Sequence, residues 1–224
     1  EEDKIKNLKF IDTIKPYGPK IEIIQKNKAI SSQTEIGMSK YDPSIKYLLL
    51  GGDGLFNTFT KKICSVGFLA KAKNENKKYI VTAEHCRDRT KRQPSKFLQL
   101  AWNSTSAAGV VGSMNADSKQ FLELNIENAI LVSSHGAHLC KSGYTTHVTC
   151  GIIRAFNAIY MVRSRVYFID FILTNMISIR GDSGGTAFRY SDLNSVILNG
   201  IIYGGLGNFA TLISPLDKIL EYTG

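Results

Sequence analysis

The stretch Gly181-Asp182-Ser183-Gly184-Gly185 sets a serine between small residues, with an acid directly before it. Glycine adopts backbone conformations that are closed to other residues and lets a substrate carbonyl approach the chain closely. A serine at such a turn is exposed as a nucleophile, and we expect the amides of Gly181 and Ser183 to converge as an oxyanion hole. The alternative is a glycine-rich turn between two strands that carries no chemistry. This stretch alone leaves both interpretations open.

A second segment, Tyr79-Ile80-Val81-Thr82-Ala83-Glu84-His85-Cys86, runs an apolar strand into a histidine that is followed at once by a cysteine. A serine hydroxyl is a poor nucleophile at neutral pH unless an adjacent imidazole accepts its proton. The two segments together predict His85 as the general base for Ser183. Here the sequence resembles the chymotrypsin-like serine peptidases, whose histidine segment reads Thr-Ala-(Ala/Gly)-His-Cys. Glu84 departs from that pattern.

The serine stretch also fits the Gly-x-Ser-x-Gly turn of the α/β-hydrolases. In that fold the acid and the histidine follow the serine in chain order. All four histidines of this chain precede Ser183: His85, His135, His138 and His147. Residues 186–190 after the turn read as a strand and not as a helix. The order of the residues therefore excludes an α/β-hydrolase.

Two further stretches resemble the secreted bacterial branch of the chymotrypsin-like peptidases, the streptogrisin and α-lytic type. Residues 48–54 and 64–68, LLLGGDG and CSVGF, look like the mature N-terminus of those enzymes. Residues 140–151, CKSGYTTHVTCG, are close to a streptogrisin-type hairpin with a Ser-Gly-x-Thr-Thr core and flanking cysteines. The resemblance covers residues 48–224. It implies a secreted serine endopeptidase whose catalytic groups lie in the cleft between two six-stranded antiparallel β-barrels.

Short apolar segments divided by turn residues independently indicate an all-β architecture. Ser214 and Pro215 are typical of an N-cap and a first helical position, so we expect a short helix at the end of the chain. The N-terminal residues are rich in Lys and Ile, and by resemblance they are the remnant of a pro-region with maturation near Leu48 to Gly51. The expected division is an extension over 1–47 and a peptidase domain over 48–224, with barrel one at about 48–133, barrel two at about 134–214 and the helix at 215–223.

The acid that orients His85 in this family opens a strand between the histidine and the serine, in the pattern Asp-x-(Ala/Gly/Thr). The matching stretch here, residues 126–132, puts Glu127 in the place of the aspartate. Glu127 is therefore the predicted third catalytic residue, on a side chain one methylene longer. The alternative is a surface glutamate at this position, with Asp117 or Glu123 approaching from the preceding segment.

The resemblance also assigns residues around the catalytic serine. Asp182 is expected to be buried, and Lys141 stands where the bacterial branch has an arginine, so a Lys141–Asp182 ion pair is predicted. Tyr203 stands where the family has a serine. No carboxylate occurs in the expected pocket walls, which predicts an apolar side chain next to the cleaved bond. The residues of these walls are Ile177, Ser178, Ile179, Arg180, Tyr203, Gly204 and Gly205.

The cysteines of the chain fall into two close pairs, which predicts the disulfides Cys64–Cys86 and Cys140–Cys150 and no free thiol. A disulfide of this kind stabilises a protein by about 2–4 kcal/mol in an oxidising compartment. A zinc site is the alternative for the second pair, because histidine and cysteine side chains can form a closed tetrahedral site. Its ligands would be His138, Cys140, His147 and Cys150.

The composition is that of a soluble globular protein, with 43% hydrophobic and 21% charged residues among 224. The net charge is +9, and its densest cluster, within residues 87–96, lacks interleaved aromatics and reads as a solvated loop. No apolar run approaches the ~18–20 residues that span a bilayer. We expect a secreted monomer whose export signal is removed or lies upstream. It would act on peptide or protein substrates without a cofactor, metal, nucleic acid or membrane.

Overall fold

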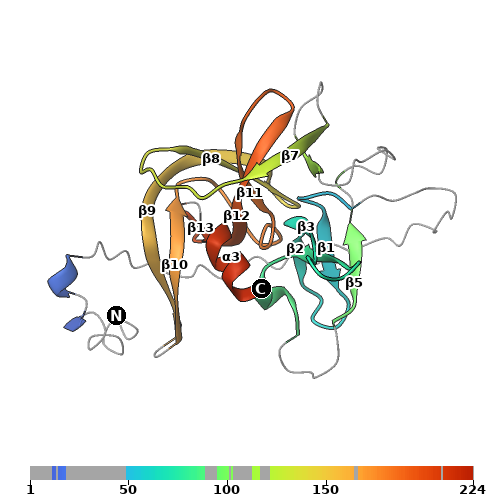
Figure 1. Ribbon diagram of the computed structural model, residues 1–224. Helices are drawn as coiled ribbons and strands as arrows, with labels where there is room; N and C mark the ends of the chain where they lie inside the picture. Colours follow the sequence, from blue (N-terminus) through green and yellow to red (C-terminus); the bar gives the residue numbers. More distant parts are fainter. Residues whose placement is uncertain are drawn as a thin grey trace, which may run out of the picture.

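The computed structural model describes residues 12–13, 15–18, 49–88, 95–100, 102, 113–116, 122–163, 166–207 and 209–223. Nearly all of the predicted N-terminal extension lies outside these residues, apart from a single 3-10 turn at Lys15–Tyr17 (η1) and its neighbours. The extension and its boundary therefore stay predictions. Within the described residues, β-strands dominate and one short helix closes the chain, which confirms the all-β class (Figure 1).

The second half of the chain forms a closed antiparallel ring of six strands among the described residues. The strands follow one another in the order β11-β8-β9-β10-β13-β12, and β12 pairs back with β11. Buried apolar side chains such as Leu139, Ile153 and Ile202 fill its interior. The strands are β8 (His138–Gly143), β9 (His147–Arg163), β10 (Val166–Thr174), β11 (Thr186–Tyr190), β12 (Ser195–Gly205) and β13 (Thr211–Pro215).

The first half is smaller and lies beside this ring (Figure 1). Its described strands form a three-stranded sheet in the order β2-β1-β5 and a separate hairpin of β3 and β4. Leu55, Val66 and Ala83 pack there around the sulfurs of Cys64 and Cys86. The strands are β1 (Gly54–Asn57), β2 (Ile63–Ser65), β3 (Phe68–Lys71), β4 (Lys78–Val81) and β5 (Phe97–Leu100).

Two strands that were expected in barrel one join the larger sheet instead. β6 (Ser113–Asn115) pairs with β7 (Glu123–Ala129), and β7 pairs in parallel with the start of β12. Leu124 is buried and Ile126 packs against the core, while Asn125 and Glu127 are exposed, as alternation along a strand requires. This pairing decides where Glu127 lies.

The closing helix α3 (Leu216–Thr223) confirms the helix that the sequence predicts at 215–223. Leu216 and Ile219 on one face of the helix are buried against Leu198 and Ile201 of β12 and against Phe68 of β3. The helix thus contacts both halves of the molecule. Within the described residues, no helix combines the length and apolar character needed to cross a membrane.

Candidate active site

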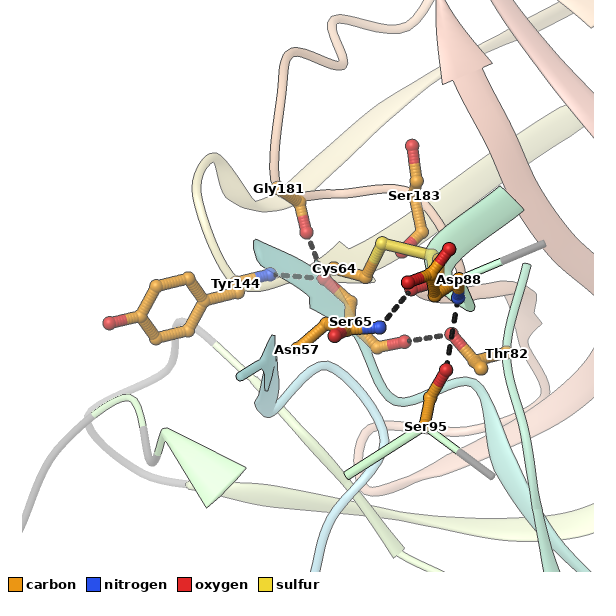
Figure 2. Close-up of a disulfide and its surroundings, with 10 residues drawn as sticks. Asn57, Cys64, Ser65, Thr82, Asp88, Ser95, Tyr144, Gly181 and Ser183 are labelled. Carbon is orange, nitrogen blue, oxygen red and sulfur yellow. Dashed lines mark hydrogen bonds between the residues drawn. A yellow bond between two sulfur atoms is a disulfide. The ribbon is translucent and has the colours of Figure 1, made fainter. Parts of the chain in front are cut away.

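The turn around Ser183 is anchored to the first half of the chain through Ser65 at the end of β2. The backbone amide of Ser65 donates to the carbonyl oxygen of Ser183 over 2.7 Å. Its hydroxyl donates to the carbonyl oxygen of Gly181 over 2.6 Å and accepts from the amide of Tyr144 over 2.9 Å. Figure 2 shows this hydroxyl between Gly181 and Tyr144, close to the Cys64 disulfide. One serine thus ties three segments together, and sequence reasoning assigned it no role.

Gly184 brings the serine turn directly against the segment that leads to His85. Its φ is +90°, a conformation that side chains rarely adopt, and a Cβ there would lie 2.5 Å from the carbonyl oxygen of Ser65 and 2.9 Å from the amide nitrogen of Ala83. Thr82 donates its hydroxyl to the same Ser65 carbonyl over 2.8 Å. The predicted nucleophile and the predicted base therefore come from segments in contact.

His85 lies on the 3-10 turn η2 (Glu84–Cys86), one residue before a buried half-cystine. The carbonyl oxygen of Cys86 accepts a hydrogen bond from the side-chain amide of Asn57 over 2.9 Å, which holds this turn on β1. Burial lowers the pKa of His85 below its ordinary value, and the positive charge of Lys62 lowers it further. The imidazole is therefore neutral near pH 7 and able to accept a proton.

The two amides that were expected to form an oxyanion hole have no internal acceptor. Gly181 has a φ of +104°, and neither its amide nor that of Ser183 donates a hydrogen bond within the structure described. The intervening and following amides are engaged, because Asp182 donates to Ile179 over 3.2 Å and Gly184 donates to Ile202 over 2.6 Å. Two alternate donors are thus left available at the serine turn, as binding of an oxyanion requires.

The predicted pair of Lys141 and Asp182 is present and fully buried. The Lys141 ammonium lies 3.6 Å from Asp182 Oδ2, and both side chains have 0% exposure. Thr146 links them, since its hydroxyl accepts from Lys141 over 2.6 Å and donates to Asp182 over 2.6 Å. Lys141 also donates to the carbonyl oxygen of His147 over 2.9 Å. Lys141 therefore reaches the carboxylate mostly through Thr146, a role that sequence reasoning missed although the Thr-Thr pair of the hairpin was noted.

Backbone amides satisfy the rest of the Asp182 carboxylate. Thr145 and Thr146 donate to Oδ1 over 2.9 and 3.0 Å, and Ile179 donates to Oδ2 over 3.0 Å. Hydrogen bonds to a charged carboxylate are stronger than neutral ones. Hydrogen bonds from the 140–146 hairpin and from residues 177–180 therefore hold Asp182, which lies between the two candidate oxyanion donors, in place.

Glu127 does not lie against His85, contrary to its predicted role. It is exposed on β7 and accepts hydrogen bonds from Ser195 over 2.5 Å and from Ser191 over 3.2 Å. The parallel pairing of β7 with β12 turns this side chain outward, next to the β11–β12 turn. Within the described residues, the buried Nδ1 of His85 has no hydrogen-bond partner. Of the alternatives, Asp117 lies outside the described residues, and no hydrogen bond joins Glu123 to His85.

The two predicted pocket walls, residues 177–180 and 203–205, lie beside each other next to the serine turn. Ile177 and Ile179 are exposed, whereas Ser178 between them is buried and its hydroxyl has no hydrogen-bond partner among the residues that the structure describes. The carbonyl of Ser178 meets the backbone of Gly205 so closely that no side chain fits there. Tyr203, in the second wall, contacts the ring of His85. Arg180 is exposed at the rim, and Gly204 has open space beside it.

Both predicted disulfides are present, and none of the four cysteines is free. Cys140 and Cys150 face each other on β8 and β9. A disulfide sulfur is not the thiolate that zinc binds, and His147 stacks instead on Trp102 with the ring centroids 4.2 Å apart. The alternative zinc site is therefore wrong.

No protein-family model matches the chain, and no curated protein matches it significantly. Solved structures do match. Thermobifida fusca protease A has a TM-score of 0.59 at 21% identity, over 79% of this chain and 96% of that one. Cellulomonas bogoriensis chymotrypsin has a TM-score of 0.57 at 23% identity, over 79% and 96%. A glutamic acid specific serine protease with a histidine triad in substrate binding has a TM-score of 0.58 at 23% identity, over 79% and 98%.

These matches span almost the whole length of each solved protein, and the identities are low, so they describe the fold. They agree with the closed six-stranded ring and the C-terminal helix found here. The chain therefore has the chymotrypsin-like fold of the bacterial serine proteases.

Proposed function

We propose that the chain is a secreted serine endopeptidase, with Ser183 as nucleophile, His85 as general base and the Gly181 and Ser183 amides as oxyanion hole. One observation carries the proposal. The serine turn packs directly on the Thr82–Cys86 segment, and within the described residues those two amides have no hydrogen-bond acceptor. The half-buried, neutral imidazole of His85 supports the same assignment.

The chemistry follows from these positions. His85 takes the proton of the Ser183 hydroxyl while its oxygen attacks the substrate carbonyl carbon, and the new oxyanion binds the two amides. The protonated imidazole then gives its proton to the leaving amine as the peptide bond breaks, and the acyl group stays on the Ser183 oxygen. Water, activated by His85 in the same way, then hydrolyses this ester and releases the carboxylic acid product. Each amide is expected to contribute about 10²–10³ in rate.

The proposal includes no acid for His85, because no carboxylate of the described residues bonds to its Nδ1. Loss of the orienting acid can lower turnover by about 10⁴-fold. We therefore expect slower turnover than in relatives that have an aspartate. Catalytic hydrogen bonds are often long before substrate binds, which agrees with the lack of a bond between Ser183 and His85 here.

The second candidate is a protease-fold module that binds peptides or a partner without efficient turnover. Among the described residues the Nδ1 of His85 has no hydrogen-bond partner, which favours this candidate, since an imidazole that no acid orients is a weak base catalyst. The two candidates differ in whether Ser183 can be acylated or phosphonylated.

Labelling with a fluorophosphonate, read by intact mass, separates them. We expect one adduct on Ser183, no adduct in Ser183→Ala, and a much slower reaction in His85→Ala. Ser191→Ala is the matched control, because this serine is exposed on the β11–β12 turn and should label like the wild type. A protein that stays unlabelled would refute the peptidase and leave the binding module.

Cleavage next to an apolar side chain is the substrate preference we propose. Ile177 and Ile179 are exposed by 49% and 43% beside the serine turn, so they can cover an apolar side chain of a bound peptide. Profiling cleavage of a peptide library tests this. A preference for Asp, Glu, Lys or Arg at that position would contradict it.

Secretion and maturation complete the proposal. The two disulfides favour an oxidising compartment, and residues 1–47 are proposed to be removed as a pro-segment near Leu48 to Gly51. Mass spectrometry of secreted protein should find a mature N-terminus in that interval. Fully active material that retains Glu1 would argue against maturation.

A further inference from the structure

Tyr203 on β12 contacts the imidazole of His85 edge to face. The two ring centroids are 5.2 Å apart, and the ring planes meet at 72°. Edge-to-face contacts between rings at this separation are favourable and directional. Within the described part of the chain, the buried Nδ1 of His85 has no hydrogen-bond partner. The imidazole therefore contacts the Tyr203 ring but no carboxylate there.

The Tyr203 ring also contacts three aromatic rings of the β9–β10 hairpin. Phe171, which is buried, lies 4.6 Å away between centroids, Phe168 lies 5.5 Å away, and Tyr160 lies 5.9 Å away. Contacts between aromatic rings at these separations are favourable beyond the area that they bury. The ring that touches His85 is therefore clamped.

The backbone at Tyr203 also departs from a regular strand. Ile202 pairs with Ile213 and Gly204 pairs with Leu212, so Tyr203 is one extra residue against β13. A bulge of this kind leaves its residue unpaired and redirects the side chain. Ile202 points into the barrel core, while Tyr203 reaches His85 in the other half of the molecule.

We propose that Tyr203 is a positioning residue for His85: its clamped ring sets the orientation of the imidazole that an acid would otherwise set. The proposal rests on the proposed role of His85 as general base. Ring shape, and not the hydroxyl, carries this role.

The test compares Tyr203→Phe, which keeps the ring, with Tyr203→Leu, which keeps an apolar side chain without a ring. Displacement of a reacting group by about 1 Å can cost about 10²-fold, so Tyr203→Leu should lower kcat about 10–100-fold. Tyr203 also lies in a predicted pocket wall, so any change in KM is scored separately and the orientation of His85 is read from kcat. Tyr203→Phe should restore kcat. Tyr190→Leu, at another tyrosine of the barrel that packs on Phe188, is the matched control and should have wild-type kcat.

A second readout does not require activity. The ring of Tyr203 should shift the proton resonances of the His85 imidazole, assigned by their loss in His85→Gln. The shift should persist in Tyr203→Phe and disappear in Tyr203→Leu. If the wild type cleaves nothing, the proposed peptidase function fails, and this measurement still decides whether Tyr203 holds the imidazole. His135 beside Phe156 and His147 beside Trp102 report on whether each variant is folded.

Two results would overturn the proposal. One is a folded Tyr203→Leu protein with unchanged imidazole resonances and unchanged kcat. The other is a Tyr203→Phe protein as impaired as Tyr203→Leu, which would assign the effect to the hydroxyl. If Tyr203→Leu does not fold, Phe168→Leu replaces it, because it loosens the clamp without touching His85. An intermediate loss of kcat with a partial change in the resonances then supports the proposal, and no change in either overturns it.

Discussion

Replacing Lys141 by methionine tests the buried ion pair beneath the serine turn. The substitution keeps an unbranched side chain in a site with 0% exposure, and it removes the ammonium 3.6 Å from Asp182 Oδ2. Attraction between unit charges at that distance is about 4–5 kcal/mol at an effective dielectric constant of about 20. Removal of one partner of a buried pair typically destabilises a protein by about 3–5 kcal/mol.

The lower end of that range is expected here. Asp182 keeps four hydrogen bonds after the substitution, from the amides of Thr145, Thr146 and Ile179 and from the Thr146 hydroxyl. We therefore expect Lys141→Met to lose about 3 kcal/mol of unfolding free energy. For a chain of this length that corresponds to a fall in Tm of about 6–12 °C.

Urea and thermal unfolding measure the loss, and a double-mutant cycle with Asp182→Asn isolates the pair. The double variant should be less destabilised than the sum of the two single variants, by about 1–3 kcal/mol. Lys71→Met, at an exposed lysine of β3, should change stability by no more than about 0.5 kcal/mol. A Lys141→Met protein as stable as this control, or a cycle without coupling, would refute the argument.

Three further predictions follow from the site. Gly184→Ala should lower stability by about 2 kcal/mol or more and slow fluorophosphonate labelling, because its Cβ would lie 2.5 Å from Ser65 O at a φ of +90°; Gly204→Ala, with open space around it, should not destabilise the protein. Burial lowers the pKa of His85 below 6.5, so the unfolded chain binds a proton at this residue at a higher pH than the folded protein does. The free energy of unfolding should therefore fall as the pH drops from 6.5 toward the pKa of the folded state. A pH dependence of stability that His85→Gln leaves unchanged would contradict this. Glu127→Ala should keep kcat within about threefold of the wild type, and a loss of orders of magnitude would return Glu127 to the catalytic site.

Much of the site was predictable because it depends on residues that are close in sequence or chemically constrained. The serine turn needs glycines at positive φ, and both Gly181 and Gly184 adopt it. Each cysteine pair closes a short segment, and both pairs form disulfides. The closing helix follows from the spacing of its apolar residues, and it begins one residue later than predicted because Ser214 and Pro215 still belong to β13.

Only the tertiary structure determines which strands pair with one another. The family pattern in residues 126–132 predicts a strand there, and it says nothing about whether that strand pairs with the first half or in parallel with β12. That choice turned Glu127 outward. Tyr203 was noted as a departure, but its rings on β9 and β10 lie more than thirty residues away in the chain. Contacts of this kind depend on the packing of the whole core, because strand pairing is determined by long-range burial and not by the local sequence pattern.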